Sequence, residues 1–134
     1  MIFHKFKKDM PLTFKTLMKK PAALRRKAVL ALGNKKDKKS FRLICEILKK
    51  DPSPVIRHEA AFLLGTTKNK TAIKFLTDSI FADESDIVVH ESIEALGDLG
   101  FRTKDVENLL KCLCGNKNSF IKDTAEIALA TLKL

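Results

Sequence analysis

The feature that most constrains the fold is a repeat of 32 residues, marked by Gly33, Gly65 and Gly97. Each of these glycines follows a short run of apolar residues. Self-similarity at this period is typical of a solenoid, in which each unit buries its apolar face against its neighbours. A fourth, degenerate copy covers residues 120–130 and has Ala130 where the glycine would fall. Because terminal repeats are commonly altered to cap the stack, this copy is expected to be the last one.

Within each repeat the spacing of apolar residues predicts two helices. The first helices are expected at about 11–20, 38–50, 70–81 and 104–114, and the second helices at about 22–32, 54–64, 87–96 and 120–132. Ser53 followed by Pro54 is a helix start signal, and glycine after the last apolar residue favours a left-handed helix end. No segment alternates as a strand does. We therefore predict an all-α, HEAT-like right-handed α-solenoid of about four helix pairs.

The length of 134 residues suits one domain with a continuous core. We expect a single HEAT-like repeat domain over 1–134. Its repeats would cover about 11–36, 37–68, 69–100 and 101–134, after an N-terminal extension at 1–10.

Charge is unevenly distributed along the chain. Residues 1–50 hold 16 of the 26 Lys and Arg but only three of the 16 acidic residues. Such a basic segment suits phosphate-bearing or acidic partners, although lysines on the solvent side of helices give the same pattern. No apolar run reaches the roughly 18 residues that a membrane span needs, so we expect no membrane partner. Three cysteines without an export signal indicate reduced thiols and a cytoplasmic protein.

Two His-Glu pairs, His58-Glu59 and His90-Glu91, recur at the same phase of the repeat. On a helical wheel each histidine faces away from the apolar stripe, and Glu59 borders its edge. Both pairs are therefore expected on the concave surface that the second helices of a solenoid line. Packed helices lie about 8–10 Å apart, a gap that two imidazoles binding one ion could bridge.

Two histidines and a carboxylate are the ligand set of non-haem iron sites. We therefore take His58, Glu59, His90 and Glu91 as candidate metal ligands, with iron as the expected metal. A homodimer that joins two concave faces would offer four pairs and could hold two irons. The simpler interpretation is that the histidines are solvated and the glutamates complement helix N-termini. The first and fourth repeats carry Arg26-Lys27 and Asp123-Thr124 instead, which confines the pairs to the centre of the chain.

Around these residues the chain resembles one half of deoxyhypusine hydroxylase, a HEAT-repeat di-iron monooxygenase with motifs of the form Arg-His-Glu-Ala-Ala-x-x-Leu-Gly. It is also similar to phycobilisome-lyase-type HEAT-like repeats, which often serve only as binding surfaces. The first resemblance implies that His58 and His90 bind iron, that Glu59 binds the opposing iron, and that Glu91 is a ligand or its close neighbour. Only two motifs are present here, and Val89 replaces the arginine that precedes the second histidine.

Three functions are compatible with the sequence. The first is a di-iron hydroxylase-like activity on a protein side chain in a homodimer. The second is a non-catalytic adaptor that binds another protein on its concave surface. The third is nucleic-acid binding through the basic residues Arg25, Arg26, Lys27, Lys35, Lys36, Lys38 and Lys39, although the chain has no Trp or Tyr to stack on a base. The cysteines do not have the spacing of a zinc site, and we assign no role to His4.

Overall fold

A computed structural model describes residues 12–133 of the chain, and within them every regular element is an α-helix. The helices are α2 (Phe14–Leu17), α3 (Ala22–Leu32), α4 (Lys38–Lys50), α5 (Pro54–Thr66), α6 (Ala72–Ala82), α7 (Asp86–Leu99), α8 (Lys104–Leu113) and α9 (Ser119–Lys133). The expected N-terminal extension and His4 lie outside the described residues. The predicted all-α class is confirmed.

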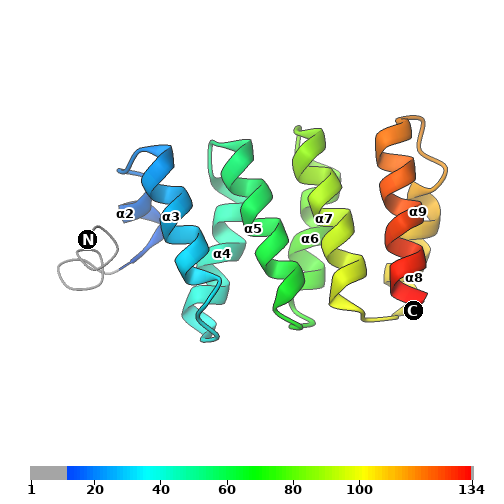
Figure 1. Cartoon of the computed structure of the whole chain (residues 1–134), viewed down its shortest axis with the longest axis horizontal. Helices are drawn as coiled ribbons and strands as arrows, with labels where there is room; N and C mark the ends of the chain where they lie inside the picture. Colours follow the sequence, from blue (N-terminus) through cyan, green and yellow to red (C-terminus); the bar gives the residue numbers. More distant parts are fainter. Residues whose placement is uncertain (1–11, 134) are drawn as a thin grey trace.

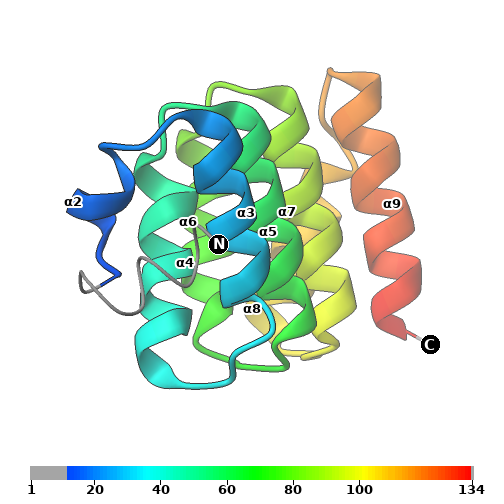
Figure 2. The same cartoon turned by 60° about the vertical axis from the view of Figure 1, so that its left-hand side comes forward.

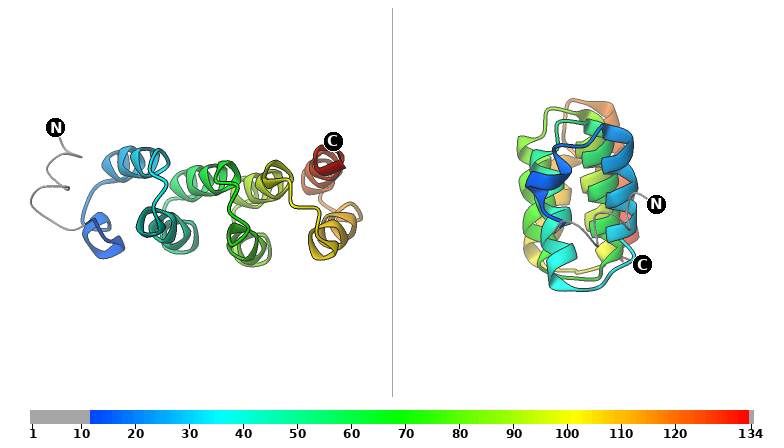
Figure 3. Two further views of the ribbon diagram at one scale, coloured as in Figure 1. Left: turned by 90° about the horizontal axis from the view of Figure 1, so that it is seen from below. Right: turned by 90° about the vertical axis from the view of Figure 1, so that its left-hand side faces the viewer.

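The helices form two layers (Figure 1). The second-helix layer consists of α3, α5, α7 and α9, and the first-helix layer of α2, α4, α6 and α8 (Figure 3). Successive helices of the second-helix layer pack along one another, α5 on α7 and α7 on α9. Seen from the end that carries α2, they follow one another in order (Figure 2). This arrangement is the HEAT-like α-solenoid that the repeat predicts.

Helix starts follow capping side chains. Asp37 accepts a hydrogen bond of 2.7 Å from the Ser40 amide at the start of α4. Ser53 likewise caps α5 before Pro54, as the sequence predicts. The first helix of repeat one is shorter than expected, because Thr13 caps it at Phe14 and it ends at Leu17. Pro21 follows closely, and proline disfavours helical backbone in the residue before it.

The prediction of left-handed helix ends at the repeat glycines is wrong. Gly33 has right-handed backbone angles, while Gly65 and Gly97 lie inside α5 and α7. Close helix approach explains these glycines. A Cβ atom at Gly65 would lie 2.9 Å from the Cα of Ala95, and one at Gly97 would lie 3.0 Å from the Ala128 carbonyl oxygen. The left-handed helix end is instead at Gly100, with φ of 75°.

These close contacts give the two layers different spacing. Small residues let α5, α7 and α9 approach backbone to backbone, whereas α4 and α6 carry no glycine and pack less closely. A groove therefore remains between α4 and α6 on the first-helix side, with Cys45, Leu48 and Phe75 in its lining.

Two ion pairs join successive repeats, one of them buried and the other partly buried. Arg25 binds Asp51 through two hydrogen bonds of 3.0 and 3.2 Å, and Arg57 binds Asp83 through two of 2.8 and 3.1 Å. Each aspartate also accepts the amide of the serine that precedes the next helix. The guanidinium and the loop are thereby held together. We call these two pairs the Arg-Asp ladder.

The ladder has no third pair. One repeat further on, Val89 and Asn116 occupy the places of the arginine and the aspartate, and neither can form an ion pair. Asn116 keeps the loop contact alone, accepting the Asn118 amide at 2.9 Å. The arginine that precedes the first His-Glu pair therefore has a structural role, which explains why the second pair can follow a valine.

Candidate functional site

The central contact of the candidate site joins two different repeats. Nε2 of His58 in α5 lies 2.8 Å from Oε1 of Glu91 in α7. About a third of the His58 side chain is exposed, and Glu91 is buried. Because Gly65 lets α5 approach α7 closely, a side chain from one helix can reach the next without an intervening layer.

The same offset occurs on either side of this contact. Arg26 binds Oε1 of Glu59 at 2.9 Å, and Nδ1 of His90 lies 2.7 Å from the Thr124 hydroxyl. In each contact the first residue is at the position of His58 in its repeat, and the second is at the position of Glu59 in the next repeat. A glutamate is therefore paired with the basic residue of the preceding repeat rather than with its own histidine. We call these six residues, on α3, α5, α7 and α9, the polar row.

His90 is held more firmly than His58. Its ring stacks on Phe120, with 4.7 Å between ring centroids and 18° between planes. The Thr124 hydroxyl donates to the Phe120 carbonyl at 2.7 Å, so it has no proton left for His90. Nδ1 of His90 is therefore the donor to Thr124, and Nε2 has a lone pair only where the ring is neutral. That nitrogen lies 3.4 Å from Oε2 of Glu94.

Glu91 has the most perturbed carboxyl group of the polar row. Burial raises its pKa to about 7, helped by a hydrogen bond to Glu94 and by the charges of Glu94, Asp98 and Glu59. Several carboxylates thus share a small region in which His58 is the nearest basic group. A positive ion at this position would relieve their repulsion.

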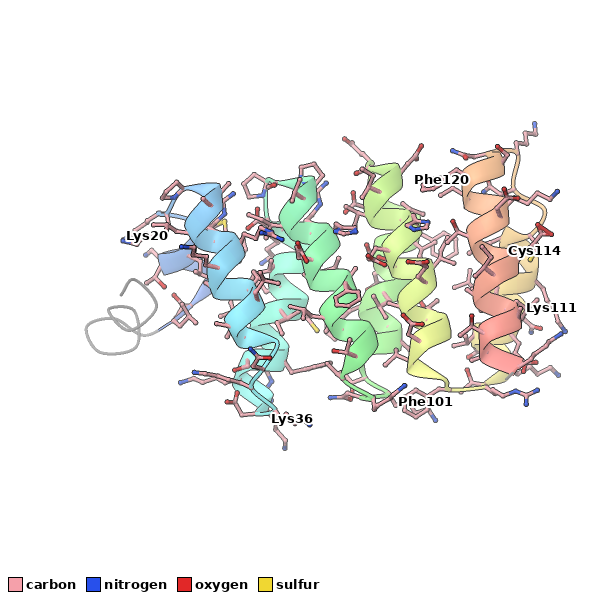
Figure 4. All side chains as sticks on the ribbon, in the orientation of Figure 1. Lys20, Lys36, Phe101, Lys111, Cys114 and Phe120 are labelled. Carbon is pink, nitrogen blue, oxygen red and sulfur yellow. The ribbon has the colours of Figure 1, made fainter. Side chains whose placement is uncertain are left out.

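Two rows of exposed apolar side chains border the polar row. They recur at the repeat spacing, because positions three or four residues before and after a polar-row residue share its helix face. One row is Val55, Ile87 and Phe120, exposed by 58%, 57% and 45%, and the other is Leu30, Phe62 and Ile127, exposed by 37%, 47% and 62%. Phe120 lies between α7 and α9 in Figure 4. Glu94 of α7 takes the place that Leu30, Phe62 and Ile127 have on the other helices. Apolar side chains therefore lie on both sides of the polar row, with one row interrupted at Glu94.

The four candidate ligands lie on this one face, but a single chain does not bring them together. Among residues 12–133, no three His, Cys, Asp or Glu side chains are close enough to hold a metal ion. His58 and Glu91 meet, Glu59 is engaged by Arg26, and His90 contacts Thr124 and Glu94. The donor types suit iron, yet one chain offers an incomplete set.

Comparison with known families settles the fold family. A model of HEAT repeats matches residues 41–130. The chain belongs to the HEAT-repeat family. This HEAT-repeat protein is also similar to the structure of human deoxyhypusine hydroxylase in complex with glycerol, with 27% sequence identity and a TM-score of 0.79. The match covers 89% of this chain and 41% of the human enzyme, so this chain spans about two fifths of that enzyme's length.

A comparison with curated proteins finds no match. None of the helices in residues 12–133 is long and apolar enough to cross a membrane.

Three features of the site were not predicted from the sequence: the contact of Thr124 with His90, the stacking of Phe120 on His90, and the apolar rows. Thr124, Phe120 and most members of the apolar rows follow from shifting a known position by one repeat, which is 32 residues between the first three repeats and 33 into the fourth. Thr124 occupies the place of Glu91 one repeat later, and Val55, Ile87 and Phe120 share a phase. The usable signal is therefore the spacing of exposed residues from one repeat to the next, whereas a helical wheel relates only residues of the same helix.

Proposed function

We propose that two copies of this HEAT-repeat protein join through their second-helix faces and bind iron with His58, Glu59, His90 and Glu91. By this proposal the dimer has a di-iron hydroxylase-like activity on a side chain of a partner protein. The contact between His58 and Glu91 carries the proposal, because it presents an imidazole and a desolvated carboxyl group together on a face that also has exposed apolar side chains.

The likeness to human deoxyhypusine hydroxylase supports the stoichiometry. The match covers most of this chain but 41% of the human enzyme, and two in-phase His-Glu pairs are present here. The family that the sequence resembles has four such pairs in two similar halves. Two copies of this chain would supply the same number.

The exposed apolar rows support the choice of face. They lie on both sides of the polar row, so a two-fold related copy could cover them while placing polar row against polar row. Burial of such rows is favourable at roughly 25 cal/mol for each Å² of apolar surface. The face is also the one that carries all four candidate ligands.

The donors present fit iron in part. Nε2 of His90 carries a lone pair where the ring is neutral, and Thr124 and Phe120 hold the ring in place. Glu91 is a buried carboxyl group beside other carboxylates. Glu59 would have to leave Arg26 to act as a ligand. Bound iron would supply dioxygen activation, a chemistry that protein side chains alone do not provide.

Iron reconstitution tests this proposal. The purified protein is loaded with Fe(II) without oxygen and desalted, and iron per chain and molar mass are measured. We expect retained iron in a dimer, and loss of iron with His58→Ala or His90→Ala. His4→Ala is the matched control, since it removes the third histidine of the chain and should leave iron binding unchanged. If none of the three substitutions changes the amount of iron bound per chain, the metal site is refuted.

A non-catalytic adaptor is the second candidate, and one observation favours it. Every buried side-chain nitrogen and oxygen of residues 12–133 already has a hydrogen-bond partner. The polar row therefore needs no metal to be satisfied. If this candidate is correct, iron stays at background in every variant, while the second-helix face still binds its protein partner. Substitution of Phe62 and Ile127 by serine would then weaken partner binding.

A further inference from the structure

The groove between α4 and α6 lies in the first-helix layer, away from the polar row, and is independent of the iron proposal. Its wider part has a volume of about 900 Å³. The loops that enter α4 and α6 form one end of it, contributing residues such as Lys36 and Asn69. A volume of this size falls within the range of known ligand pockets.

Basic side chains dominate the wider part. Seven of its lining residues are Lys or Arg, against the two carboxylates of Asp37 and Glu46. Asp37 is occupied in capping α4, and Glu46 pairs with Lys50 at 3.5 Å. Seven cations against two carboxylates leave the wider part with a net positive charge.

Four of these cations are available to a ligand. Lys36, Lys38, Arg42 and Lys49 are exposed, and none forms an ion pair within the part of the chain that the structure describes. Lys68 differs, because it donates to the Asp98 carbonyl at 2.6 Å. The free positive charge thus lies on α4 and on the loop that leads into it.

The lining between these charges is partly apolar. Phe41 and Phe75 are half-buried there, and Cys45 is almost fully covered. The groove continues into a smaller hollow of about 370 Å³, which shares Cys45, Lys49 and Phe75 with the wider part. Asp78 and Glu84 line this smaller hollow. Lys49, Arg57 and Lys74 also line it, together with Asp83, so cations and carboxylates balance there. The excess positive charge of the groove is therefore confined to its wider part.

We propose that this groove binds an acidic segment of a partner protein, with an apolar side chain of the segment against Phe41 and Phe75. Carboxylates of the segment pair with Lys36, Lys38, Arg42 and Lys49. Long phosphate chains fit less well, since the excess positive charge is confined to the wider part and the smaller hollow has as many carboxylates as cations. Two of the basic residues that the sequence offered to nucleic acid are also engaged, Arg25 by Asp51 and Arg26 by Glu59.

Fluorescence anisotropy tests the groove. The probes are a labelled peptide that alternates Glu with Leu, the same peptide with Gln for every Glu, and a labelled poly-dT oligonucleotide. Charge reversal in Lys36→Glu/Lys49→Glu should weaken binding of the acidic peptide by about tenfold or more, as loss of two charge-assisted contacts predicts. Lys111→Glu/Lys122→Glu is the matched control, because it changes net charge equally on α8 and α9. Lys36 and Lys111 lie toward opposite ends of the molecule (Figure 4).

A second variant separates the apolar contact from charge. Thr71 lines the groove, is exposed, and makes no capping hydrogen bond at the start of α6. Thr71→Trp should fill part of the groove and weaken binding of the acidic peptide, while every charged side chain stays in place. Circular dichroism verifies that each variant is folded.

The outcomes divide clearly. The proposal is supported if both groove variants bind the acidic peptide more weakly than wild type does. The α8 and α9 control should keep wild-type binding, and the Gln peptide should bind wild type more weakly than the Glu peptide does. Equal binding of the Gln peptide, or equal loss in the α8 and α9 control, overturns it. Tighter binding of poly-dT that depends on Lys36 and Lys49 also overturns it, and assigns the groove to nucleic acid.

Discussion

Nε2 of His58 lies 2.8 Å from Oε1 of Glu91, although the two residues belong to adjacent repeats. The equivalent contact one repeat earlier is the Arg26–Glu59 ion pair, and one repeat later it is the His90–Thr124 hydrogen bond. The His-Glu pairs of the sequence are therefore parts of a connection between repeats, whatever else they bind.

Removal of the His58 imidazole should destabilise the metal-free protein. His58→Ala leaves the buried Glu91 carboxyl group without its nearest basic partner, and loss of such a hydrogen bond costs about 1–3 kcal/mol. Urea denaturation measures the change in unfolding free energy. Glu91→Gln in the same background should restore part of it, because a neutral amide is less costly to leave unpaired than a carboxylate.

Arg26→Ala is the comparison for His58→Ala, because it removes the equivalent contact one repeat earlier. Half of the Arg26 side chain is exposed, so its ion pair with Glu59 should contribute less than about 1 kcal/mol. A loss for Arg26→Ala as large as that for His58→Ala would contradict the importance of burial in this row.

The Arg-Asp ladder should be far more sensitive than surface ion pairs. Asp51→Ala leaves the buried Arg25 guanidinium unpaired, and breaking a buried pair in this way costs about 3–5 kcal/mol. Glu46→Ala removes an exposed pair with Lys50 and should cost less than about 1 kcal/mol. Thermal unfolding of the two variants, followed by circular dichroism, checks the contrast. Similar melting temperatures would mean that the ladder does not hold the repeats together.

Gly65→Ala should destabilise the protein even though alanine favours helices. The added Cβ atom would lie 2.9 Å from both Cα and Cβ of Ala95, so α5 and α7 must separate, at about 1–3 kcal/mol. Gly115→Ala is the matched control, since its Cβ atom would meet only the Cys112 carbonyl oxygen at 3.5 Å. Its effect on denaturation by urea should be small. Equal effects would show that helix spacing is not set at Gly65.

The repeat was read from the sequence more successfully than its contacts were. A period of 32 residues predicted both layers, because burying an apolar stripe at each repeat leaves few other packings. The role of Gly65 was misread, since a glycine near a helix end and a glycine under a neighbouring helix look alike without a partner helix in view. The candidate ligands were placed on the correct helices, but the pairing of His58 with Glu91 depends on the axial shift between α5 and α7, which no local pattern encodes.

Alkylation should distinguish the three thiols. Burial raises the pKa of Cys45 to about 12, whereas Cys112 is exposed. Because the thiolate is the reactive form, iodoacetamide should modify Cys112 first, Cys114 more slowly and Cys45 only in denaturant. Mass spectrometry of timed digests measures the order. Fast modification of Cys45 in the folded protein would mean that the groove opens more than the structure indicates.

Asp37 should make the free energy of unfolding depend on pH in the acidic range. Its hydrogen bond from the Ser40 amide lowers its pKa below the ordinary value of 3.8, so its capping contribution is present above that pH and is lost as the pH falls through the folded pKa. Asp37→Asn removes the titrating charge. The difference in unfolding free energy between wild type and this variant should be larger at about pH 6 than at about pH 3. Asp123→Asn, an exposed change within α9, should show a smaller difference, and an equal one would contradict the assignment.

The Arg-Asp ladder and the polar row have a consequence for how such a chain can be lengthened. Each joins a residue of one repeat to a residue of the next, so a duplicated copy of residues 54–85 inserted after Ser85 would bring its own Arg57, His58, Glu59 and Asp83 in register. The new junctions would remake an arginine–aspartate pair and a histidine–glutamate rung. At the C-terminal side, Val89, Asn116 and Thr124 terminate both series together. Repeats can thus be added in the middle of the chain without breaking either series of contacts.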